Sequence, residues 1–278
     1  MAAPNPAYAH CEAFLREHAR DQWLAALFIP ESLRHHVHAL HAFSAEIQRV
    51  PDIVSDPRLG EIRLQWWREC LEGARLGEAG LNPVTAALIA TIGECRLPVQ
   101  PLLDLIEAHR FDLYNDAMPG LNDLEGYCGE TRSSLIRLTT LVLSGGGIPG
   151  GAEACGHAGV ALGVTKILRN LPLHARRVQC YVPRDILEKH GLTPQTFTPD
   201  GPSLPISAAV REMRDIALAN YRSARAGLQL LDASIRPAFI PIAPVQIYLK
   251  AVEKMSKNPF SNMPEIAVWR RQWAMWRF

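Results

Sequence analysis

One segment near the middle of the chain is rich in bases and free of acids. It reads VTKILRNLPLHARRVQCYVPR and spans residues 164–184. Between residues 154 and 184 no Asp or Glu occurs, although five basic side chains do: Lys166, Arg169, Arg176, Arg177 and Arg184. Such a segment can bind an anion, form a solvated basic face, or be a catalytic segment that has lost its carboxylates. Because Lys166, Arg169 and Asn170 are spaced i, i+3 and i+4, they are expected on one helix face.

Two aspartates have a spacing that suits a divalent cation. Asp52 and Asp56 are four residues apart, so on a helix both carboxylates would face one Mg²⁺ ion. Pro51 and Pro57 bracket them so closely that there is little room for a helix between. The favoured interpretation is a loop with solvated acids, and the metal site is the alternative.

Histidines gather in the segment RHHVHALH, which contains His35, His36, His38 and His41. His38 and His41 are three apart and share a helix face, as do His35 and His38. A metal site needs a third and a fourth ligand in fixed geometry, and the sequence offers none nearby. We therefore expect a histidine face that is partly buried and holds no metal.

Polar side chains also interrupt an apolar helical pattern in YCGETRSS. Tyr127, Arg132 and Ser134 either line a polar cavity or form a buried paired network, because buried charges normally have partners. Glu130 lies in the same stretch.

The last residues, WRRQWAMWRF, repeat tryptophan at steps of four and three, at Trp269, Trp273 and Trp276. Arg270, Arg271 and Arg277 lie beside them. This is the pattern of a basic aromatic amphipathic helix, expected over residues 264–278. We expect it to dock on its own domain, with a membrane surface or a partner protein as the alternative.

The composition is that of an ordinary globular protein. The chain has 278 residues, of which 48% are hydrophobic and 21% charged, and its net charge is +1. No global field favours nucleic acid, so no nucleic-acid partner is expected. The six cysteines are widely spaced, which favours reduced thiols. No secretory leader or membrane span is recognisable, so we expect a cytoplasmic protein, with a peripheral position on the inner membrane as the alternative.

Helical periodicity dominates the chain and positions these side chains. Residues 31–50 repeat Leu33, Val37, Leu40, Phe43 and Ile47 at helical steps. Residues 58–77 suggest a buried stripe of Leu59, Ile62, Trp66, Cys70 and Leu71. Asn122 or Asp123 is the expected N-cap of a later helix. Since no alternating strand pattern occurs, the prediction is one all-α domain of roughly ten helices, with a tight bend at 144–151.

Six segments, in order, resemble the squalene/phytoene synthase family. They are LFIPESLRHHVHALHAF, PVTAALIA, PLLDLIEAHRFDL, LEGYCGETRSS, VTKILRN and QCYVPRDIL. The resemblance covers roughly residues 8–255 and implies a single-domain all-α isoprenoid-synthase fold around a central cavity.

The family's chemistry requires carboxylates, and this sequence lacks most of them. In the family, two aspartate-rich helices hold Mg²⁺ ions that bind the diphosphate of a prenyl substrate. The corresponding positions here are Gln48 and Asp52 in the first helix and Asn170 and His174 in the second. Only Asp52 is acidic. The resemblance therefore implies a fold that has lost its prenyl-transfer activity, with no catalytic residue and no Mg²⁺ cofactor.

A non-catalytic branch of the family has a similar acid-poor second motif and a similar tail with tryptophan and basic residues. That branch serves the assembly of mitochondrial respiratory complex I. The similarity implies an assembly or scaffolding factor whose partners are complex I subunits or assembly intermediates. Trp269, Arg270, Trp273 and Trp276 are the residues expected at the membrane surface, at the periphery of the inner membrane. Without an obvious presequence, a bacterial relative is favoured.

Two alternatives remain open. The first is a divergent prenyl-diphosphate transferase that uses Mg²⁺, Asp52 and Asp56. The second is a lipid- or anion-binding protein that uses the old cavity, with candidate contacts at Arg49, Tyr127, Arg132, Lys166, Arg169 and Arg176.

Overall fold

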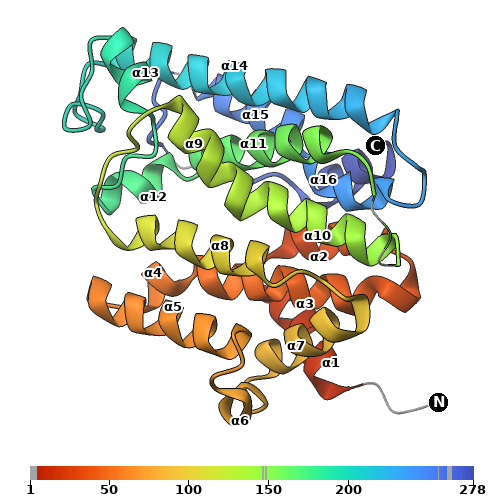
Figure 1. Cartoon of the computed structure of the whole chain (residues 1–278). Helices are drawn as coiled ribbons and strands as arrows, with labels where there is room; N and C mark the ends of the chain where they lie inside the picture. The colour runs from red at the N-terminus through yellow and green to blue at the C-terminus, as the bar shows by residue number, and fades with distance from the viewer. Residues whose placement is uncertain (1–4, 146, 148, 256, 262–264) are drawn as a thin grey trace. The chain divides into compact units, whose positions relative to one another are not determined.

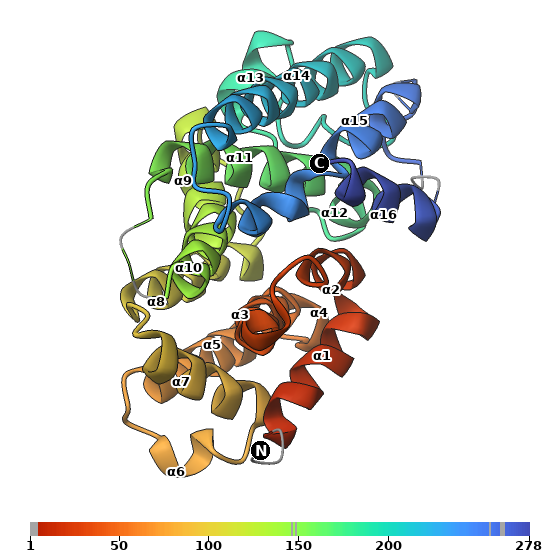
Figure 2. The ribbon, with the colours of Figure 1, turned by 90° about the vertical axis from the view of Figure 1, so that its right-hand side faces the viewer.

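A computed structural model describes residues 5–145, 147, 149–255, 257–261 and 265–278. Throughout these residues the regular elements are helices, as Figures 1 and 2 show, which confirms the all-α prediction. The chain forms two compact units that alternate along the sequence. Unit one comprises Met1–Leu113, Ser134–Gly151 and Leu231–Pro241, and unit two comprises Tyr114–Ser133, Ala152–Leu230 and Ile242–Phe278. That the whole chain is one domain stays a prediction.

Unit one is built around helix α3. Its helices are α1 (Pro6–His18), α2 (Arg20–Ala26), α3 (Glu31–Gln48), α4 (Val50–Ile53), α5 (Pro57–Leu71), α6 (Leu76–Ala79), α7 (Pro83–Cys95), α8 (Gln100–Ala108), the 3₁₀ turn η1 (His109–Leu113) and α10 (Ser134–Leu143). Helix α3 packs against α1, α7 and α10. The expected stripe is confirmed, because Val37, Leu40, Phe43 and Ile47 are buried and Leu33 packs at the edge of the core.

The buried face of α5 differs in part from the one expected. Cys70 is buried as predicted, and Trp66 and Leu71 pack against the core. Leu59 and Ile62 are 51% and 67% exposed, whereas Leu64 and Trp67 are buried. The sequence of α5 contains two apolar stripes, and packing against α8 and η1 selects the second. Gly60 belongs to that second stripe, and a side chain there would overlap Leu113. The missing side chain at Gly60 lets η1 approach and so decides which face is buried.

Unit two is built around helix α11. Its helices are α9 (Leu121–Cys128), the π-helical turn η2 (Gly129–Ser133), α11 (Ala152–Arg169), α12 (Leu171–Arg176), α13 (Arg184–Lys189), α14 (Ser203–Leu228), α15 (Val245–Lys254) and α16 (Val268–Trp276). Helix α11 packs against α14, α15, α9 and η2 (Figure 2). Val164, Ile167, Leu168 and Leu171 are buried, as their spacing predicts.

Two glycines allow α11 to approach the segment before it. A methyl group on Gly159 would overlap the backbone and hydroxyl of Ser133, and one on Gly163 would overlap the Cys128 sulfur. The Ser133 hydroxyl instead donates to the Gly156 carbonyl at 3.2 Å. The close contact between η2 and α11 therefore requires small residues such as Gly159 and Gly163, because a larger side chain would hold the two backbones apart.

Helix α9 begins a few residues earlier than expected. The helix starts at Leu121 with Gly120 in the capping position, so the prediction of Asn122 or Asp123 as N-cap is wrong. Asp185, which lies far along the chain, accepts from the Leu121 N–H at 3.0 Å. A cap supplied by a distant side chain removes the need for a local one.

Three other expectations are answered in the described residues. The bend expected at 144–151 follows α10 and precedes α11, although residues 146 and 148 lie outside the described part. All six cysteines are free thiols, as expected. Where the structure is described, no helix has the length and apolar character needed to cross a bilayer.

Candidate functional site

The first degenerate motif lies in unit one, where α3 ends and α4 follows. Gln48 is the last residue of α3, and its amide donates to Ser44 Oγ at 2.7 Å. Asp52 lies in the short helix α4 and is exposed. Arg49 joins the two helices, and its guanidinium carbon lies 5.5 Å from the centre of the Phe14 ring. A single carboxylate near a guanidinium is a poor starting point for a Mg²⁺ site.

Asp52 and Asp56 do not share a loop, which corrects the prediction. Asp56 is the N-cap of α5, where its carboxylate accepts from the Arg58 N–H at 2.8 Å. The same carboxylate pairs with the Arg58 guanidinium at 2.7 Å. Hydrogen bonds from Arg58 lower the pKa of Asp56 to about 2. The carboxylate is therefore charged but already used by a cap and an ion pair.

The second degenerate motif lies in unit two, where α11 gives way to α12. Helix α11 ends at Arg169, and Asn170 precedes α12, which has Pro172 in its first turn. The His174 N–H still donates to the Asn170 carbonyl at 2.9 Å. Helical i, i+4 geometry thus survives the proline, so Asn170 and His174 keep the backbone spacing that the family resemblance assigns to a pair of carboxylates.

One base on this face, Arg169, stacks on an aromatic ring. The Arg169 guanidinium carbon lies 3.5 Å from the centre of the Tyr248 ring on α15. Lys166, one turn earlier, is half-buried. Such stacking fixes a cation and leaves its N–H groups to point away from the ring. The face of α11 that bears Asn170 is therefore neutral to basic.

Three aromatic side chains connect the candidate residues of unit two. The His174 ring centre is 4.6 Å from that of Tyr181, and Tyr181 is 6.0 Å from Tyr127. Tyr127 and Arg132 are both half-buried, and Arg132 belongs to the π-helical turn η2. Glu130 of the same turn is exposed. The structure thus brings Tyr127 and His174 to one aromatic cluster, whereas Arg176 is exposed at the end of α12.

The chain after α12 adopts an unusual backbone conformation. Val178 has a φ of 56°, in the left-handed region, and is 76% exposed. The Gln179 N–H donates to the His174 carbonyl at 2.9 Å, and the Val178 N–H donates to Ala175 at 3.2 Å. This pair of bonds closes a helix in a turn that normally carries glycine.

A residue that sequence reasoning missed is Asp185. It follows QCYVPR in a resembling motif, and it caps α9 through the Leu121 N–H. The Met118 N–H donates to the Cys180 carbonyl at 3.1 Å, and the Arg184 N–H donates to the Met118 carbonyl at 3.0 Å. These bonds hold residues 180–185 beside the start of α9, where Asp185 caps that helix. Only the long-range contact reveals it.

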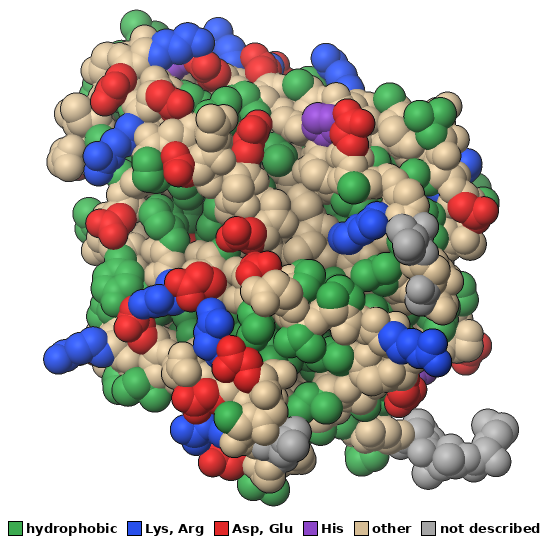
Figure 3. Space-filling model, viewed as in Figure 1, with side chains coloured by type: hydrophobic (Ala, Val, Ile, Leu, Met, Phe, Trp, Pro, Cys, Tyr) green, Lys and Arg blue, Asp and Glu red, His purple; other side chains and the backbone are tan. Residues whose placement is uncertain are grey.

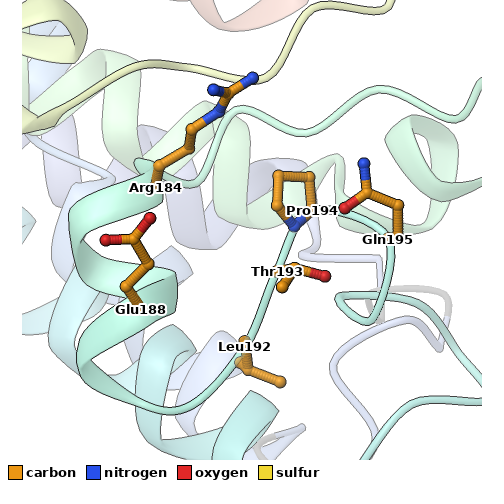
Figure 4. Close-up of a pocket in the computed structure, with 6 residues that line it drawn as sticks. All are labelled: Arg184, Glu188, Leu192, Thr193, Pro194 and Gln195. Carbon is orange, nitrogen blue, oxygen red and sulfur yellow. The ribbon is translucent and has the colours of Figure 1, made fainter.

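Two hollows in the surface have charges that are mixed in sign. In unit two, a pocket of 280 Å³ is lined by Arg184 and Glu188 of α13 and by residues 192–195, as Figure 4 shows. In unit one, a groove of 600 Å³ follows α5 and α8. There Arg110 pairs with Glu61 at 2.8 Å and Arg68 with Glu107 at 3.1 Å. Red and blue alternate over this region in Figure 3. Paired charges of this kind make a solvated face and do not select an anion or a cation.

The C-terminal helix exposes its tryptophans. Helix α16 spans Val268–Trp276, a shorter range than the expected 264–278, of which residue 264 lies outside the described residues. Trp269, Trp273 and Trp276 are 67%, 54% and 71% exposed. Met275 is the buried residue of the helix, and Phe278 packs under the Arg225 guanidinium at 4.2 Å. The helix docks on unit two through these two residues, so the tryptophan stripe itself does not dock as expected.

Comparison with solved structures defines the class of protein. A dehydrosqualene synthase crystal structure matches with a TM-score of 0.79 at 18% identity, covering 98% of this chain and 95% of that one. Squalene synthase HpnC from Alicyclobacillus acidocaldarius matches with a TM-score of 0.76 at 25% identity, covering 92% and 96%. The fold is therefore the all-α isoprenoid-synthase fold.

A model of the squalene/phytoene synthase family matches residues 15–277, so the chain belongs to that family. Among its relatives, the complex I assembly factor 6 of Rattus norvegicus is 27% identical over 253 residues, covering 91% of this chain and 76% of that protein. The human protein of the same name is 26% identical over 253 residues, covering 90% and 75%. A 15-cis-phytoene synthase of Synechococcus elongatus is 23% identical over 289 residues, covering 98% and 92%.

Proposed function

We propose that this protein is a non-catalytic member of its family that acts as an assembly or scaffolding factor for respiratory complex I. The observation that carries the proposal is the side-chain chemistry of the two degenerate motifs. Gln48, Asn170 and His174 stand where relatives with prenyl-transfer activity need carboxylates, and Asp52 alone remains.

Electrostatics at the two motifs supports the absence of metal-dependent chemistry. Mg²⁺ takes oxygen ligands in near-octahedral geometry and needs more than one carboxylate to offset its dehydration. Arg49 adjoins the first motif, and Lys166 and Arg169 adjoin the second. Positive charge close to a site raises the electrostatic cost of bringing a divalent cation to it.

The relatives support the complex I part of the proposal. Complex I assembly factors match over nine-tenths of this chain, so the similarity extends through both units. The phytoene synthase of Synechococcus elongatus matches over 98% of this chain, at a lower identity of 23%. The number of carboxylates at the two motifs is therefore what favours the assembly factor over the synthase.

We further propose that α16 attaches the protein to the surface of the membrane in which complex I resides. Its three tryptophans line an open groove of 540 Å³ together with Gln272. Arg270 and Arg277 are exposed on the same helix. Tryptophan at the headgroup level with arginine beside anionic lipid is a recognised interfacial combination.

The alternative of an anion or lipid binder has one specific observation in its favour. Arg169 is stacked on Tyr248 and is thereby pre-oriented, as a guanidinium that receives a phosphate would be. Replacing the diphosphate's metal ions by fixed cations would let the same face hold an anionic headgroup without Mg²⁺.

Gene deletion followed by complementation tests the main proposal. Deletion should lower NADH:quinone oxidoreductase activity and the amount of assembled complex I on native gels, and the wild-type gene should restore both. An Asp52→Ala variant should restore them equally well, since no metal chemistry depends on this carboxylate. Normal complex I in the deletion strain would overturn the proposal.

A direct assay tests the enzymatic alternative. The purified protein is incubated with farnesyl or geranylgeranyl diphosphate and Mg²⁺, and products are separated by mass. We expect no turnover. Turnover that disappears in Asp52→Ala but persists in the matched variant Asp56→Asn would establish a prenyl transferase instead.

A further inference from the structure

Two histidines of α3 and one glutamate of α7 come together in unit one, where these helices pack side by side (Figure 1). His35, His36 and Glu94 each offer one ligand atom, and these three atoms lie within 4.8 Å of one another. His35 and His36 have ring centres 3.9 Å apart. Glu94 lies in the last turn of α7, far from the histidines in sequence.

The hydrogen bonds of His36 point its second nitrogen at the glutamate. Nδ1 lies 3.0 Å from the hydroxyl of Thr91, which is three residues before Glu94 and thus on the same face of α7. Nε2 lies 3.6 Å from Glu94 Oε2. When Nδ1–H donates to Thr91, Nε2 presents a lone pair to the carboxylate. The Tyr8 hydroxyl lies 3.4 Å from the same Nδ1 and 3.2 Å from the Thr91 hydroxyl, so Nδ1 has hydrogen-bond partners while Nε2 faces Glu94.

The 3.6 Å separation suits a shared ion better than a direct contact. Two ligands at the usual distances from a tetrahedral Zn²⁺ ion are roughly 3.4 Å apart. His36 is 5% exposed, so packing restricts the position of its imidazole at this site.

The side chains of His35 and Glu94, the other two proposed ligands, have room to move at the surface. The Tyr8 ring lies edge-on to both imidazoles, with centre distances of 4.6 Å and 5.7 Å, and forms one wall. His35 is half-buried, and the Glu94 side chain is 60% exposed. The His35 and Glu94 side chains can therefore each move by about an ångström toward a bound ion, and a water molecule can supply the fourth ligand.

We propose that His35, His36 and Glu94 form a site for a divalent transition-metal ion of the Zn²⁺ class, which would tie the start of α3 to the end of α7. Two nitrogen ligands and one carboxylate oxygen suit such an ion and do not suit Mg²⁺. The site lies in unit one and uses neither degenerate motif, so it is independent of the function proposed above.

Zinc titration of the full-length, chelator-treated protein tests the site. Free Zn²⁺ is followed with a chromogenic chelator, and Co²⁺ substitution supplies a visible spectrum that reports coordination. We expect one tightly bound equivalent. His35→Gln and Glu94→Gln should each weaken binding tenfold or more, and the double variant should lose both the site and its Co²⁺ spectrum.

Matched controls separate this site from general histidine binding. His10→Gln and Glu31→Gln replace exposed residues of the same types elsewhere in unit one and should bind as the wild type does. Circular dichroism checks that every variant is folded. The proposal is overturned when the wild type binds no equivalent, when the double variant keeps the wild-type affinity, or when the controls lose as much affinity as the site variants.

Discussion

Val178 has an unfavourable backbone conformation, and its side chain is too exposed for burial to offset the cost. A β-branched residue in the left-handed region costs about 1–2 kcal/mol, and at 76% exposure little burial offsets that cost. Strain of this kind is often kept where a loop serves a function. Here it follows the basic pair Arg176 and Arg177 directly.

Val178→Gly should stabilise the protein by about 1 kcal/mol, because relief of strain outweighs the extra freedom of glycine in the unfolded chain. The measurement is the free energy of unfolding in urea. Gln179→Gly, at the next position and with no positive φ, should bring no gain. Equal losses in both variants would show that Val178 is not strained.

Glu212 shows how a single carboxylate couples two helices. It lies on α14 and accepts from Lys189 and His190, each at 2.7 Å. The hydrogen bond from Lys189 and that from His190 lower the pKa of Glu212 below its ordinary value of 4.5, against an opposing effect of partial burial. Since the folded pKa is depressed, this stabilisation is present above the unfolded pKa and is lost as the pH falls through the folded pKa.

Glu212→Gln should lower the free energy of unfolding by about 0.5–1 kcal/mol at neutral pH. The difference from the wild type should begin to shrink as the pH falls below 4.5, where the unfolded chain takes up the proton, and should vanish once the pH falls through the lower pKa of the folded carboxylate. Urea unfolding at several pH values measures this. If the difference in unfolding free energy stays constant with pH, the charge of Glu212 is not what stabilises the fold.

At the scale of elements, the packing of α11 against η2 is the most demanding contact of unit two. Gly159→Ala should lower the free energy of unfolding by about 1–3 kcal/mol, since the added methyl group overlaps the Ser133 backbone. Gly156→Ala is the control on the same helix, because nothing lies within 4 Å of its new methyl group. It should be neutral or stabilising. Similar behaviour of the two variants in thermal unfolding would contradict this account.

Helix α16 carries the prediction of membrane attachment. Trp269→Ala, Trp273→Ala and Trp276→Ala together should abolish co-flotation with vesicles that contain anionic lipid. Arg270→Gln with Arg277→Gln should weaken only the part of binding that salt screens. All five side chains are exposed, so the fold should tolerate these changes. Unchanged flotation of the triple tryptophan variant would exclude α16 as the attachment site.

At the scale of the whole molecule, the proposed non-catalytic function implies that the chain does not bind Mg²⁺ together with a diphosphate. Millimolar Mg²⁺ with inorganic pyrophosphate should not raise the unfolding temperature of the wild type, because a ligand stabilises only in proportion to its binding. Differential scanning fluorimetry is the measurement. A rise that requires Mg²⁺ and disappears in Asp52→Ala would restore the metal-dependent alternative.

The sequence by itself determined the helical class and the family. Helical periodicity can be recognised without any knowledge of tertiary contacts, because burial repeats every three to four residues wherever a helix faces a core. The stripe of Val37, Leu40, Phe43 and Ile47 was therefore predictable directly. The assignment of Gln48, Asn170 and His174 to carboxylate positions came from the family resemblance and stays a prediction.

Only the tertiary structure decided which of two apolar faces α5 buries, which residue caps α9, and where Glu94 lies relative to His36. Each depends on a contact between segments distant in the chain: Gly60 with Leu113, Leu121 with Asp185, and α3 with α7. Side-chain spacing describes one element at a time. The third ligand of the proposed metal site comes from another helix, so local spacing excluded a metal that the packing of two helices makes chemically reasonable.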